Sequence, residues 1–343
     1  MKKKPFTIAD IARLADVDKS TVSRALNGSD KVKPETKRKI QEIVEQYNFR
    51  PSVAAKTLAK GTIKNIALIV PERNVSRALI SPVFPQVFYG IGKVAAHYEY
   101  NVTIVTSAKL DDNEYLKIIN NHQADGFIII GVEINDSFPH LFEKENIPYI
   151  IIGKFPDSRI ENSVSTDNRT GGYLAAKYLL DQGHRDIMIM GGNENWYHNT
   201  RRLEGIRKAY EEFDLTFHDS NIIMNQTNLQ KGYDTFTAII KQGRPVPDAI
   251  FCLSDTAALA VNSAAFDLGI SIPKNLSIIG FGNHFFSDFI RPRLTTVEEE
   301  LDRIGEIAME NLYQIIHRDQ KKIANVELTP RLIVRDSTSS KIY

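Results

Sequence analysis

The chain is almost without cysteine, and this excludes two classes of protein. Cys252 is the only cysteine among 343 residues, so a disulfide within the chain and a zinc site of several thiolates are both impossible. It stands in the apolar run AIFCL, where we expect a buried small hydrophobic residue and not a reactive thiol. The eight histidines are scattered along the chain, so we expect no metal site.

Long apolar runs are missing as well. No run approaches the roughly 20 residues that span a bilayer, so we expect no membrane partner. The segment MKKKPFTIADIARL at the start carries positive charge, but polar residues return before an apolar stretch of signal-peptide length forms. We therefore expect no secretion signal and a location in the cytoplasm.

The motifs of common α/β enzymes are absent too. There is no G-x-G-x-x-G after a β-rich run, no P-loop and no G-x-S-x-G. We interpret His184, in the turn GHRD, as a structural cap and not as a catalytic base. The pattern of strands and helices described below is compatible with an enzyme of sugar or nucleotide metabolism. The missing motifs argue against it, so we expect no catalytic residue, no cofactor and no enzymatic activity.

Charge is unevenly distributed along the chain. Residues 1–61 contain 14 Lys and Arg against 7 Asp and Glu, whereas the remainder contains 29 against 35. A basic first part on an acidic body predicts a polyanionic partner for the first part only.

The stretch TIADIARLADVDKSTVSRALN, residues 7–27, predicts two short helices joined by a tight turn. Thr7 precedes an apolar-periodic segment and Asp10 follows three residues later, as in a capping box. Val22 and Leu26 share one face of the second helix and are expected to pack on the first. The other face carries donors and no carboxylate: Lys19, Ser20, Ser23, Arg24 and Asn27. Such a face fits the acceptor-lined groove of DNA, and an ordinary two-helix corner with a solvated face is the alternative.

A third helix and a short linker follow. The helix is predicted from Pro34, and its inner face is expected to hold Ile40, Ile43, Val44 and Tyr47. The segment PSVAAKTLAKG, residues 51–61, has a proline start, good helix formers and a glycine end, but so short a helix is marginal in water. We interpret it as an interdomain linker that folds against DNA, where Leu58 wedges between base pairs from the minor groove.

From Asn65 onward, short β-rich runs alternate with amphipathic segments. The expected strands are 66–70, 102–106, 126–130, 149–152, 187–190, 221–224, 249–253 and 276–280. The expected helices are 86–99, 112–122, 137–145, 170–182, 200–213, 229–241 and 254–269. Apolar strands between helices predict parallel sheets covered on both faces. Two runs of four strands predict two similar doubly wound subdomains, with a ligand cleft between them.

The sequence resembles the lactose-repressor (LacI) family of bacterial transcription regulators from Thr7 to about Arg335. In the basic part the matching segments are TIADIARLADVDKSTVSRALNG, VKPETKRKI and YNFRPSVAAKTLAKG. In the body they are VSTDNRTGGYLAAKYLLDQGHRDI, RRLEGIRKAY, DAIFCLSDTAALA, LSIIGFGN and RPRLTTVEEE. The segments occur in order and at the spacing of the family, which makes the resemblance specific.

The resemblance implies an α/β protein with an all-α head. We expect a helix-turn-helix head at 1–50, a hinge helix or linker at 51–62 and a core of periplasmic-binding-protein type at 63–337. The core is expected to hold two doubly wound parallel-sheet subdomains, one at about 63–162 and 294–323 and the other at about 163–293 and 324–337. The tail is expected at 338–343. Nothing after Arg335 (DSTSSKIY) resembles a leucine-heptad tetramerisation segment, so a dimer is favoured over a tetramer.

The resemblance also implies which residues contact DNA. Lys19, Ser20 and Arg24 take the base-reading positions, and bidentate pairing of Arg24 with guanine would supply about 1–3 kcal/mol of discrimination. Leu58 matches the family's intercalating leucine, and Lys56 stands where many members carry arginine. The expected DNA-binding set is Thr7, Lys19, Ser20, Thr21, Ser23, Arg24, Asn27, Lys56 and Leu58.

For the effector cleft the resemblance points to four residues. Arg202, in RRLEG, matches the arginine that grips ligand hydroxyls or a carboxylate, and Asp255 lies on a strand-to-helix turn that faces the cleft. In GFGN, Gly282 stands where aspartate is usual, which leaves Asn283 and one hydroxyl-binding carboxylate fewer. Trp196, the only tryptophan, is either a core residue or a stacking platform for a sugar ring. Asp167, by contrast, is expected to cap a helix.

Taken together, these features predict a ligand-responsive transcriptional repressor of a carbohydrate-utilisation operon. The expected partners are near-palindromic operator DNA in the nucleoid, a second copy of the chain in a homodimer, and a small effector that changes DNA affinity, typically by about 1–3 kcal/mol. A sugar, such as a maltose-like α-glucoside, is the first expectation for the effector, and a nucleobase or phosphosugar corepressor is the alternative. A solute-binding protein shares the core fold but would need a secretion signal and would lack the basic head.

Overall fold

The computed structural model describes residues 7–26, 29–47, 62–71, 81–107, 124–226, 228–317 and 323–341. Asn27, the predicted hinge with Lys56 and Leu58, and the predicted helix 112–122 lie outside these residues. The chain divides into two compact units, Met1–Lys64 and Asn65–Tyr343, and each is described by itself. Within the described ranges, no helix combines the length and apolar character needed to cross a membrane.

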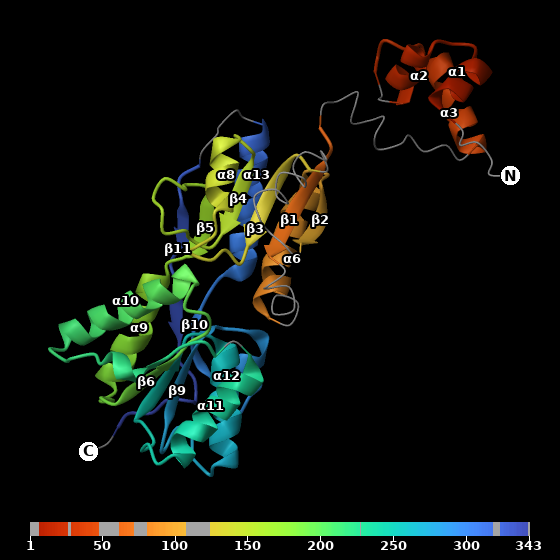
Figure 1. The fold of residues 1–343 in the computed structure, drawn as a ribbon. Helices are drawn as coiled ribbons and strands as arrows, with labels where there is room; N and C mark the ends of the chain where they lie inside the picture. Colours follow the sequence, from red (N-terminus) through yellow and green to blue (C-terminus); the bar gives the residue numbers. More distant parts are fainter. Residues whose placement is uncertain are drawn as a thin grey trace. The chain divides into compact units, whose positions relative to one another are not determined.

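The described residues of the first unit form three helices (Figure 1): α1 (Ile8–Ala15), α2 (Lys19–Leu26) and α3 (Pro34–Gln46). Its core consists of Ile11, Ala12, Ala15, Val22 and Ile40, with Leu26, Ile43 and Val44 partly buried against them. The predicted packing of the second helix on the first is therefore confirmed. Tyr47, expected on the inner face of α3, is instead 46% exposed, because the helix ends one residue before it.

The second unit contains two six-stranded sheets with helices on both faces, and Figure 1 shows the first of them beside α6, α8 and α13. Its strands lie in the order β11-β5-β4-β3-β1-β2, and all pair in parallel. They are β1 (Asn65–Pro71), β2 (Asn101–Ser107), β3 (Gly126–Ile130), β4 (Tyr149–Ile152), β5 (Ser163–Thr166) and β11 (Val326–Leu328). Because side chains alternate along a strand, Ile66 and Leu68 pack with α6 (Val83–His97) and α13 (Leu301–His317), whereas Ala67 and Ile69 pack with α8 (Phe138–Lys144).

The second sheet repeats this plan. Its order is β12-β10-β9-β8-β6-β7, and only the β10–β12 pair is antiparallel among the described strands. The strands are β6 (Ile187–Met190), β7 (Ile222–Ile223), β8 (Ala249–Cys252), β9 (Ser277–Gly282), β10 (Thr295–Glu298) and β12 (Arg331–Ile333). Ile187 and Ile189 pack with α9 (Asn168–Asp181) and α10 (Tyr197–Glu212). Met188 and Met190 face α11 (Leu229–Lys241) and α12 (Asp255–Asp267).

The two sheets correspond strand by strand. In each, the order reverses once, between β1 and β3 in the first and between β6 and β8 in the second, and a doubly wound sheet has its ligand crevice at such a reversal. All eight predicted strands are present, so the expectation of two doubly wound subdomains is confirmed. Strands β5, β10, β11 and β12 and helix α13 were not predicted.

The chain passes between the two sheets three times, through segments that we call the crossovers. They are Asp167 between β5 and α9, Glu299 and Glu300 between β10 and α13, and residues 329–330 between β11 and β12. We expected the passages near 162/163, 293/294 and 323/324, but β5, β10 and β11 place each of them a few residues further along the chain. These strands are short, and their sequences SVST, TTVE and VEL carry few large apolar side chains.

Candidate functional site

The first candidate surface belongs to the three-helix unit. Thr7 begins α1 in the predicted capping box, and the Asp10 carboxylate accepts from the Thr7 backbone N–H at 3.0 Å and from its hydroxyl at 2.7 Å. Asp16 ends the helix in the left-handed region, with a φ of 57°, and donates its N–H to the carbonyl of Ala12. This tight turn allows α2 to follow at once and to pack Val22 against α1.

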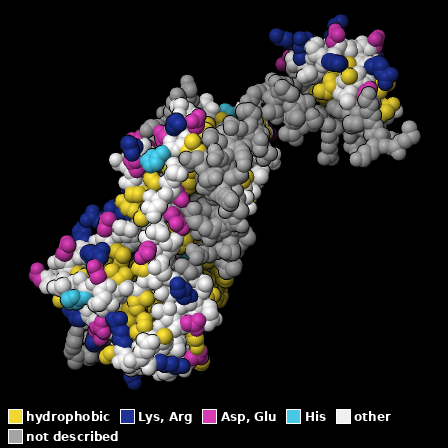
Figure 2. Space-filling view, viewed as in Figure 1, with side chains coloured by type: hydrophobic (Ala, Val, Ile, Leu, Met, Phe, Trp, Pro, Cys, Tyr) yellow, Lys and Arg dark blue, Asp and Glu magenta, His cyan; other side chains and the backbone are white. Residues whose placement is uncertain are grey.

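The outward side of α2 carries no carboxylate along its described length. Its exposed and half-buried polar side chains are Lys19, Ser20, Thr21, Ser23 and Arg24. Lys and Arg side chains lie along the outside of this unit in Figure 2. Such a row of donors can approach base-edge acceptors and phosphates without repulsion from a fixed negative charge.

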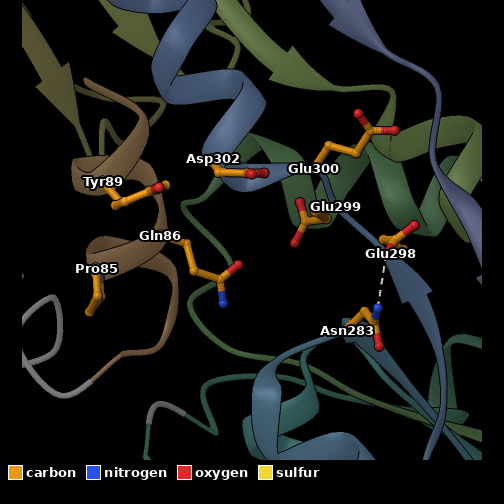
Figure 3. Close-up of a pocket in the computed structure, with 8 residues that line it drawn as sticks. All are labelled: Pro85, Gln86, Tyr89, Asn283, Glu298, Glu299, Glu300 and Asp302. Carbon is orange, nitrogen blue, oxygen red and sulfur yellow. Dashed lines mark hydrogen bonds between the residues drawn. The ribbon is translucent and has the colours of Figure 1, made fainter. Parts of the chain in front are cut away.

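The second candidate site is a cavity of about 440 Å³ in the core unit, bordered by elements of both sheets. Its lining residues are Pro85, Gln86, Tyr89, Asn283, Glu298, Glu299, Glu300 and Asp302. Figure 3 shows Gln86 and Tyr89 extending from α6 toward the acidic segment on the other side. Pro85, Gln86 and Tyr89 come from α6. Asn283 follows β9, and Glu298 ends β10. Glu299 and Glu300 lie on the second crossover, and Asp302 lies at the start of α13. This volume falls within the roughly 300–1,000 Å³ of small-molecule pockets.

The cavity wall is acidic. Four of the eight lining residues are carboxylates, and none of the described lining residues is lysine or arginine. Two arginines lie behind this wall: Arg331 approaches Glu298 at 2.7 Å and Glu300 at 3.9 Å, and Arg202 approaches Glu299 at 3.1 Å. The oxygens of such a wall accept hydrogen bonds from hydroxyl or ammonium groups, and its charge opposes a phosphate or carboxylate ligand.

Arg202 is buried and all three of its guanidinium nitrogens are engaged. Nε donates to Asn168 Oδ1 at 2.8 Å, Nη1 to the carbonyl of Leu253 at 2.5 Å, and Nη2 to Glu299 Oε1 at 3.1 Å. The guanidinium also lies 3.5 Å from the centroid of the Phe281 ring. Burial lowers the pKa of Arg202 from its ordinary value, and the charge of Glu299 acts against that shift. Arg202 thus connects α10 with the start of α9, with the segment after β8 and with the second crossover.

Asp255 is fully buried at the start of α12, and both of its oxygens are occupied. Oδ2 accepts from the His284 N–H at 2.8 Å and from Ser287 Oγ at 2.6 Å, and Oδ1 accepts from Thr296 Oγ1 at 2.5 Å. Asp255 is not among the residues that line the cavity. Its contacts hold the segment after β9 against β10.

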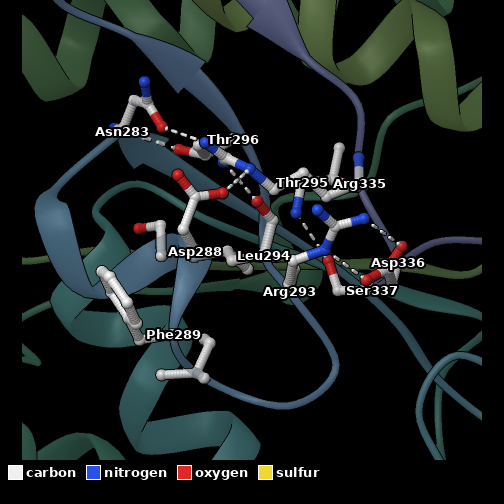
Figure 4. Close-up of polar contacts among 12 residues, drawn as sticks. Asn283, Asp288, Phe289, Arg293, Leu294, Thr295, Thr296, Arg335, Asp336 and Ser337 are labelled. Carbon is white, nitrogen blue, oxygen red and sulfur yellow. Dashed lines mark hydrogen bonds and ion pairs between the residues drawn. The ribbon is translucent and has the colours of Figure 1, made fainter.

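Asn283 is the one predicted effector residue that lines the cavity. Its Nδ2 donates to Glu298 Oε1 at 2.9 Å (Figure 3), and its Oδ1 accepts from Arg335 Nη2 at 2.7 Å (Figure 4). Arg335 also pairs through Nε with Asp288 at 2.7 Å. The preceding Gly282 has a φ of +132°, and a Cβ there would lie 2.7 Å from His284 Nε2, which explains why glycine replaces the expected aspartate.

Trp196 lies at the start of α10, half-buried, with its ring 5.4 Å from the ring of His198. Its Nε1 is buried and has no hydrogen-bond partner in the described part of the chain. Burial and the nearby charge of Arg202 hold the pKa of His198 well below its ordinary value, so this ring is neutral at pH 7. Trp196 and His198 therefore form an aromatic pair one helical turn from Arg202.

Several smaller predictions have clear outcomes. Asp167 caps α9, accepting from the Thr170 N–H at 3.0 Å and from its hydroxyl at 2.6 Å, so the predicted capping role is confirmed. Cys252 is buried as expected, and burial raises the pKa of its thiol. His184 is buried with Nε2 3.0 Å from the carbonyl of Ser339, in agreement with a structural role.

The sequence argument missed most of the cavity wall. It did not single out Gln86, Tyr89 or the acidic residues 298–300 and 302. The acidic run EEELD directly after TTV was the available signal, because it stands at the end of the family-like segment RPRLTTVEEE. Gln86 and Tyr89 carried no such signal.

Comparisons with known proteins agree with this architecture. The family model described as bacterial regulatory proteins of the lacI family matches residues 7–52, and the model of a periplasmic binding protein-like domain matches residues 176–338. Catabolite control protein A of Priestia megaterium is 30% identical over 337 residues, which cover 97% of this chain and 99% of the relative.

Two solved structures share the fold. The lac repressor dimer bound to operator and the anti-inducer ONPF superposes with a TM-score of 0.86 at 21% identity, covering 98% of this chain and 100% of that one. The complex of the transcriptional regulator CelR with cellobiose gives a TM-score of 0.74 at 22% identity, covering 97% and 99%. The chain therefore belongs to the LacI family of DNA-binding transcriptional repressors, whose cores bind small-molecule effectors.

Proposed function

We propose that this protein is a sugar-responsive repressor of a carbohydrate-utilisation operon that works as a homodimer on a near-palindromic operator. The observation that carries the proposal is the pairing of a carboxylate-free donor face on α2 with a cavity between two doubly wound sheets. A protein that binds operator DNA works in the cytoplasm at the nucleoid. Enzymatic activity has no part in this proposal, and the catabolite control protein that it resembles is a regulator.

DNA recognition is assigned to the head and the hinge. Lys19, Ser20 and Arg24 are exposed on α2 and contact the bases. Supporting contacts with the sugar-phosphate backbone of the DNA are assigned to Thr7, Thr21, Ser23 and Asn27. Lys56 and Leu58, outside the described residues, take phosphate and minor-groove contacts. Two heads on one dimer gain affinity by avidity, so a modest change per head alters operator occupancy strongly.

The effector is assigned to the cavity and the residues beside it. Glu298, Glu299 and Asn283 offer hydrogen-bonding atoms to the hydroxyl groups of a ligand, and Tyr89 adds a ring face. A neutral sugar satisfies such a wall, whereas a phosphosugar would bring negative charge against four carboxylates. The complex of CelR with cellobiose shows a sugar on a protein of this fold. A nucleobase remains the second candidate.

The four residues predicted for the effector have different parts in this proposal. Asn283, which lines the cavity, contacts the ligand directly. Trp196, which is not one of the lining residues, offers its ring and its Nε1 from the start of α10. Arg202 and Asp255 act indirectly, because both are buried and neither lines the cavity. Effector binding closes the two sheets on each other and thereby changes the DNA affinity.

The DNA part is tested on inverted-repeat sequences selected from a random library. Arg24→Ala should weaken binding to the selected site by about 1–3 kcal/mol, yet leave binding to unrelated DNA much less affected. Arg38→Ala on the outside of α3 is the matched control, because it removes the same charge from another face. Equal losses for both variants on both kinds of DNA would contradict base reading by α2.

The effector part is tested by thermal unfolding with neutral disaccharides, nucleobases and phosphosugars. A neutral sugar at a hundred times its dissociation constant should add about 2.7 kcal/mol to the unfolding free energy. Glu298→Gln should reduce this gain without changing operator selection. Stabilisation by phosphosugars alone would refute the neutral-sugar assignment and leave the DNA-binding function intact.

A further inference from the structure

Two loops from different sheets of the core contact each other directly. The first follows β3 and holds Glu133 and Ile134, and the second follows β6 and holds Asn193 and Asn195. Asn193 Nδ2 donates to Glu133 Oε1 at 2.9 Å, and the Ile134 N–H donates to the carbonyl of Asn195 at 3.0 Å. We call these four residues the clasp. It joins the two halves of the core, each built on one sheet, at a place other than the crossovers.

The clasp lies at a distance from the crossovers. The crossovers follow β5 and β11 in the first sheet and β10 in the second. One strand, β4, separates β3 from β5, and two strands, β8 and β9, separate β6 from β10. At about 4.8 Å per strand, β3 and β6 lie roughly 10–14 Å from these crossover strands. A rotation of roughly 15° about the crossovers would therefore move the clasp residues apart by roughly 3 Å, which breaks both hydrogen bonds.

Both loops of the clasp are also fixed by contacts of their own. In the first loop, the Glu133 N–H donates to Asp136 Oδ2 at 2.8 Å, and the Asp136 N–H donates to the Glu133 carbonyl at 3.1 Å. In the second, Asn193 Oδ1 accepts from the Asn195 N–H at 2.9 Å, and the Asn193 carbonyl accepts from Asn199 Nδ2 at 2.8 Å. Closing the clasp thus orders little chain that is not already ordered, so its entropy cost is small.

The cavity depends on the same closed arrangement. Its residues Gln86 and Tyr89 come from the first half of the core, whereas Asn283 and Glu298 come from the second. Gln86 Nε2 also lies 3.5 Å from Nδ1 of His284. These contacts join protein atoms, so they need no ligand to form. A rotation that opens the clasp would draw the two walls of the cavity apart.

We propose that the clasp holds the core closed before an effector binds and thereby sets the operator affinity of the effector-free protein. The inference rests on the proposed function, in which closure of the two sheets changes DNA affinity. Glu133 and Asn193 do not line the cavity, so they are positioning residues that raise the fraction of chains in which it is formed. Loosening the clasp lowers that fraction, and apparent effector affinity falls with it.

The test reverses the polarity of the clasp. Asn193→Asp replaces only the Nδ2 donor by an oxygen, so the Asn195 N–H keeps its acceptor while two carboxylates face each other. Adding Glu133→Gln supplies a donor from the other loop and restores a hydrogen bond. Asn275→Asp is the matched control, an exposed position before β9 where Oδ1 accepts from the Ser271 N–H. It makes the same chemical change at the opposite end of the strands of the second sheet.

The first readout is amide hydrogen exchange of the full chain without DNA or effector, resolved to single residues. The Ile134 N–H reports opening, because its acceptor belongs to the other half of the core. The Asp136 N–H is the internal reference, because its acceptor Glu133 belongs to the same loop. Asn193→Asp should speed exchange of Ile134 relative to Asp136 about ten-fold or more, as expected when a hydrogen bond to a charged group is lost. The double variant should return close to the wild-type rate, and Asn275→Asp should keep it.

Three exchange results would overturn the clasp: an unprotected Ile134 N–H in the wild type, an unchanged rate in Asn193→Asp, or no rescue by Glu133→Gln. Glu133→Ala, on the other loop, replaces Asn193→Asp if the latter fails to fold by circular dichroism. It should also speed exchange of Ile134, because Asn193 Nδ2 then loses its acceptor.

Operator binding is the second readout. On the selected inverted repeat and without effector, Asn193→Asp should change the dissociation constant about 5-fold or more, and the double variant should restore it. An unchanged constant together with faster exchange of Ile134 would overturn the link between the clasp and DNA. If the wild type selects no operator, the proposed function is wrong, whereas the exchange rates still decide whether the clasp holds the core closed.

Discussion

Asp255 accepts hydrogen bonds from three separate segments of the chain: the loop after β9, the 3₁₀ turn η2 (Phe285–Asp288) and the strand β10. The sequence placed it correctly at a strand-to-helix turn, but its neighbours were out of reach because they lie about 30 to 40 residues away. In the structure its oxygens are already occupied by protein donors. A buried carboxylate of this kind is a structural centre whose loss leaves donors without partners.

Asp255→Asn should therefore destabilise the core unit by about 1–3 kcal/mol. The amide keeps one acceptor oxygen but replaces the other by an NH₂ group, which faces donors in a region without water access. Urea unfolding measures the loss. Glu211→Gln at an exposed position of α10 is the control, and a surface change of this kind stays within about 0.5 kcal/mol. A loss of that small size for Asp255→Asn would mean that the network is dispensable.

The role of a single residue could be predicted when its partner lies close to it in the sequence. Residues with a local partner, such as Thr7 with Asp10 and Asp167 with Thr170, were recognised from spacing alone. Residues that work through distant partners were not, and Arg335 with Asn283 is the clearest case. Spacing in sequence carries information only over a helical turn or a tight loop.

Among the elements, the second crossover and the residues next to the other two are joined by two arginines, Arg202 and Arg331. Arg202 on α10 bonds Asn168, directly after the first crossover, and Glu299 within the second. Arg331, after the third, pairs with Glu298 beside the second. The Arg202–Glu299 pair is buried, with side-chain exposures of 6% and 12%, whereas Arg331 is 67% exposed. Only the first pair is therefore expected to matter strongly for stability.

Arg202→Met should cost about 3–5 kcal/mol, because it leaves Glu299 buried without a counter-charge. The double change Arg202→Met/Glu299→Leu should recover a substantial part of the loss, since no unpaired charge remains. The four proteins of this cycle are compared by chemical denaturation, and a coupling of about 0.5–3 kcal/mol is expected. Arg331→Met is the exposed control, with a loss below about 1 kcal/mol. Additive losses in the cycle would show that the two side chains do not act as a pair.

Element prediction succeeded where apolar periodicity was strong and failed where it was weak. The eight strands found in advance are rich in isoleucine, valine and methionine, whereas β5 reads SVST and β12 has only three residues. Helix α13 was also not predicted, but for a different reason. Its buried residues Leu301, Ile304, Ala308, Met309 and Leu312 follow a helical period, so the signal was present in the sequence.

For the molecule as a whole, buried neutral histidines set the response to pH. Burial lowers the pKa of His184 and of His284 below the value of about 6.5 that they have in the unfolded chain. His184 Nδ1 is buried, and no described group accepts a hydrogen bond from it, so a proton there would be costly. The unfolded chain takes up protons below about pH 6.5 that the folded chain resists, and stability is therefore lost as the pH falls through that value.

The unfolding free energy should be highest above about pH 6.5 and should fall between pH 6.5 and 5, by up to about 1.4 kcal/mol per pH unit for each histidine. Urea titrations at a series of pH values give this slope. His184→Gln should reduce it, whereas His218→Gln, at an exposed position, should not. A free energy that stays constant across this range would show that the folded chain protonates these rings freely.

The overall architecture was the most predictable level, because charge, helix pattern and strand alternation all pointed to a basic head and a two-part core. The exact division of the core was less predictable, because the crossovers depend on the short strands β5, β10 and β11. The composition of the cavity wall required the structure, since α6 and the acidic segment around Glu299 are more than 200 residues apart.

The crossovers also govern how the chain is completed on the ribosome. The first sheet needs β11 and the second needs β12, and these two strands come after all the other described strands in the sequence. Neither half of the core can complete its sheet until these late strands have been translated, although most of each half is made much earlier. A premature stop codon near Ile323 would thus leave two open sheet edges at once, and the nascent polypeptide would be exposed to proteolysis and aggregation in both halves.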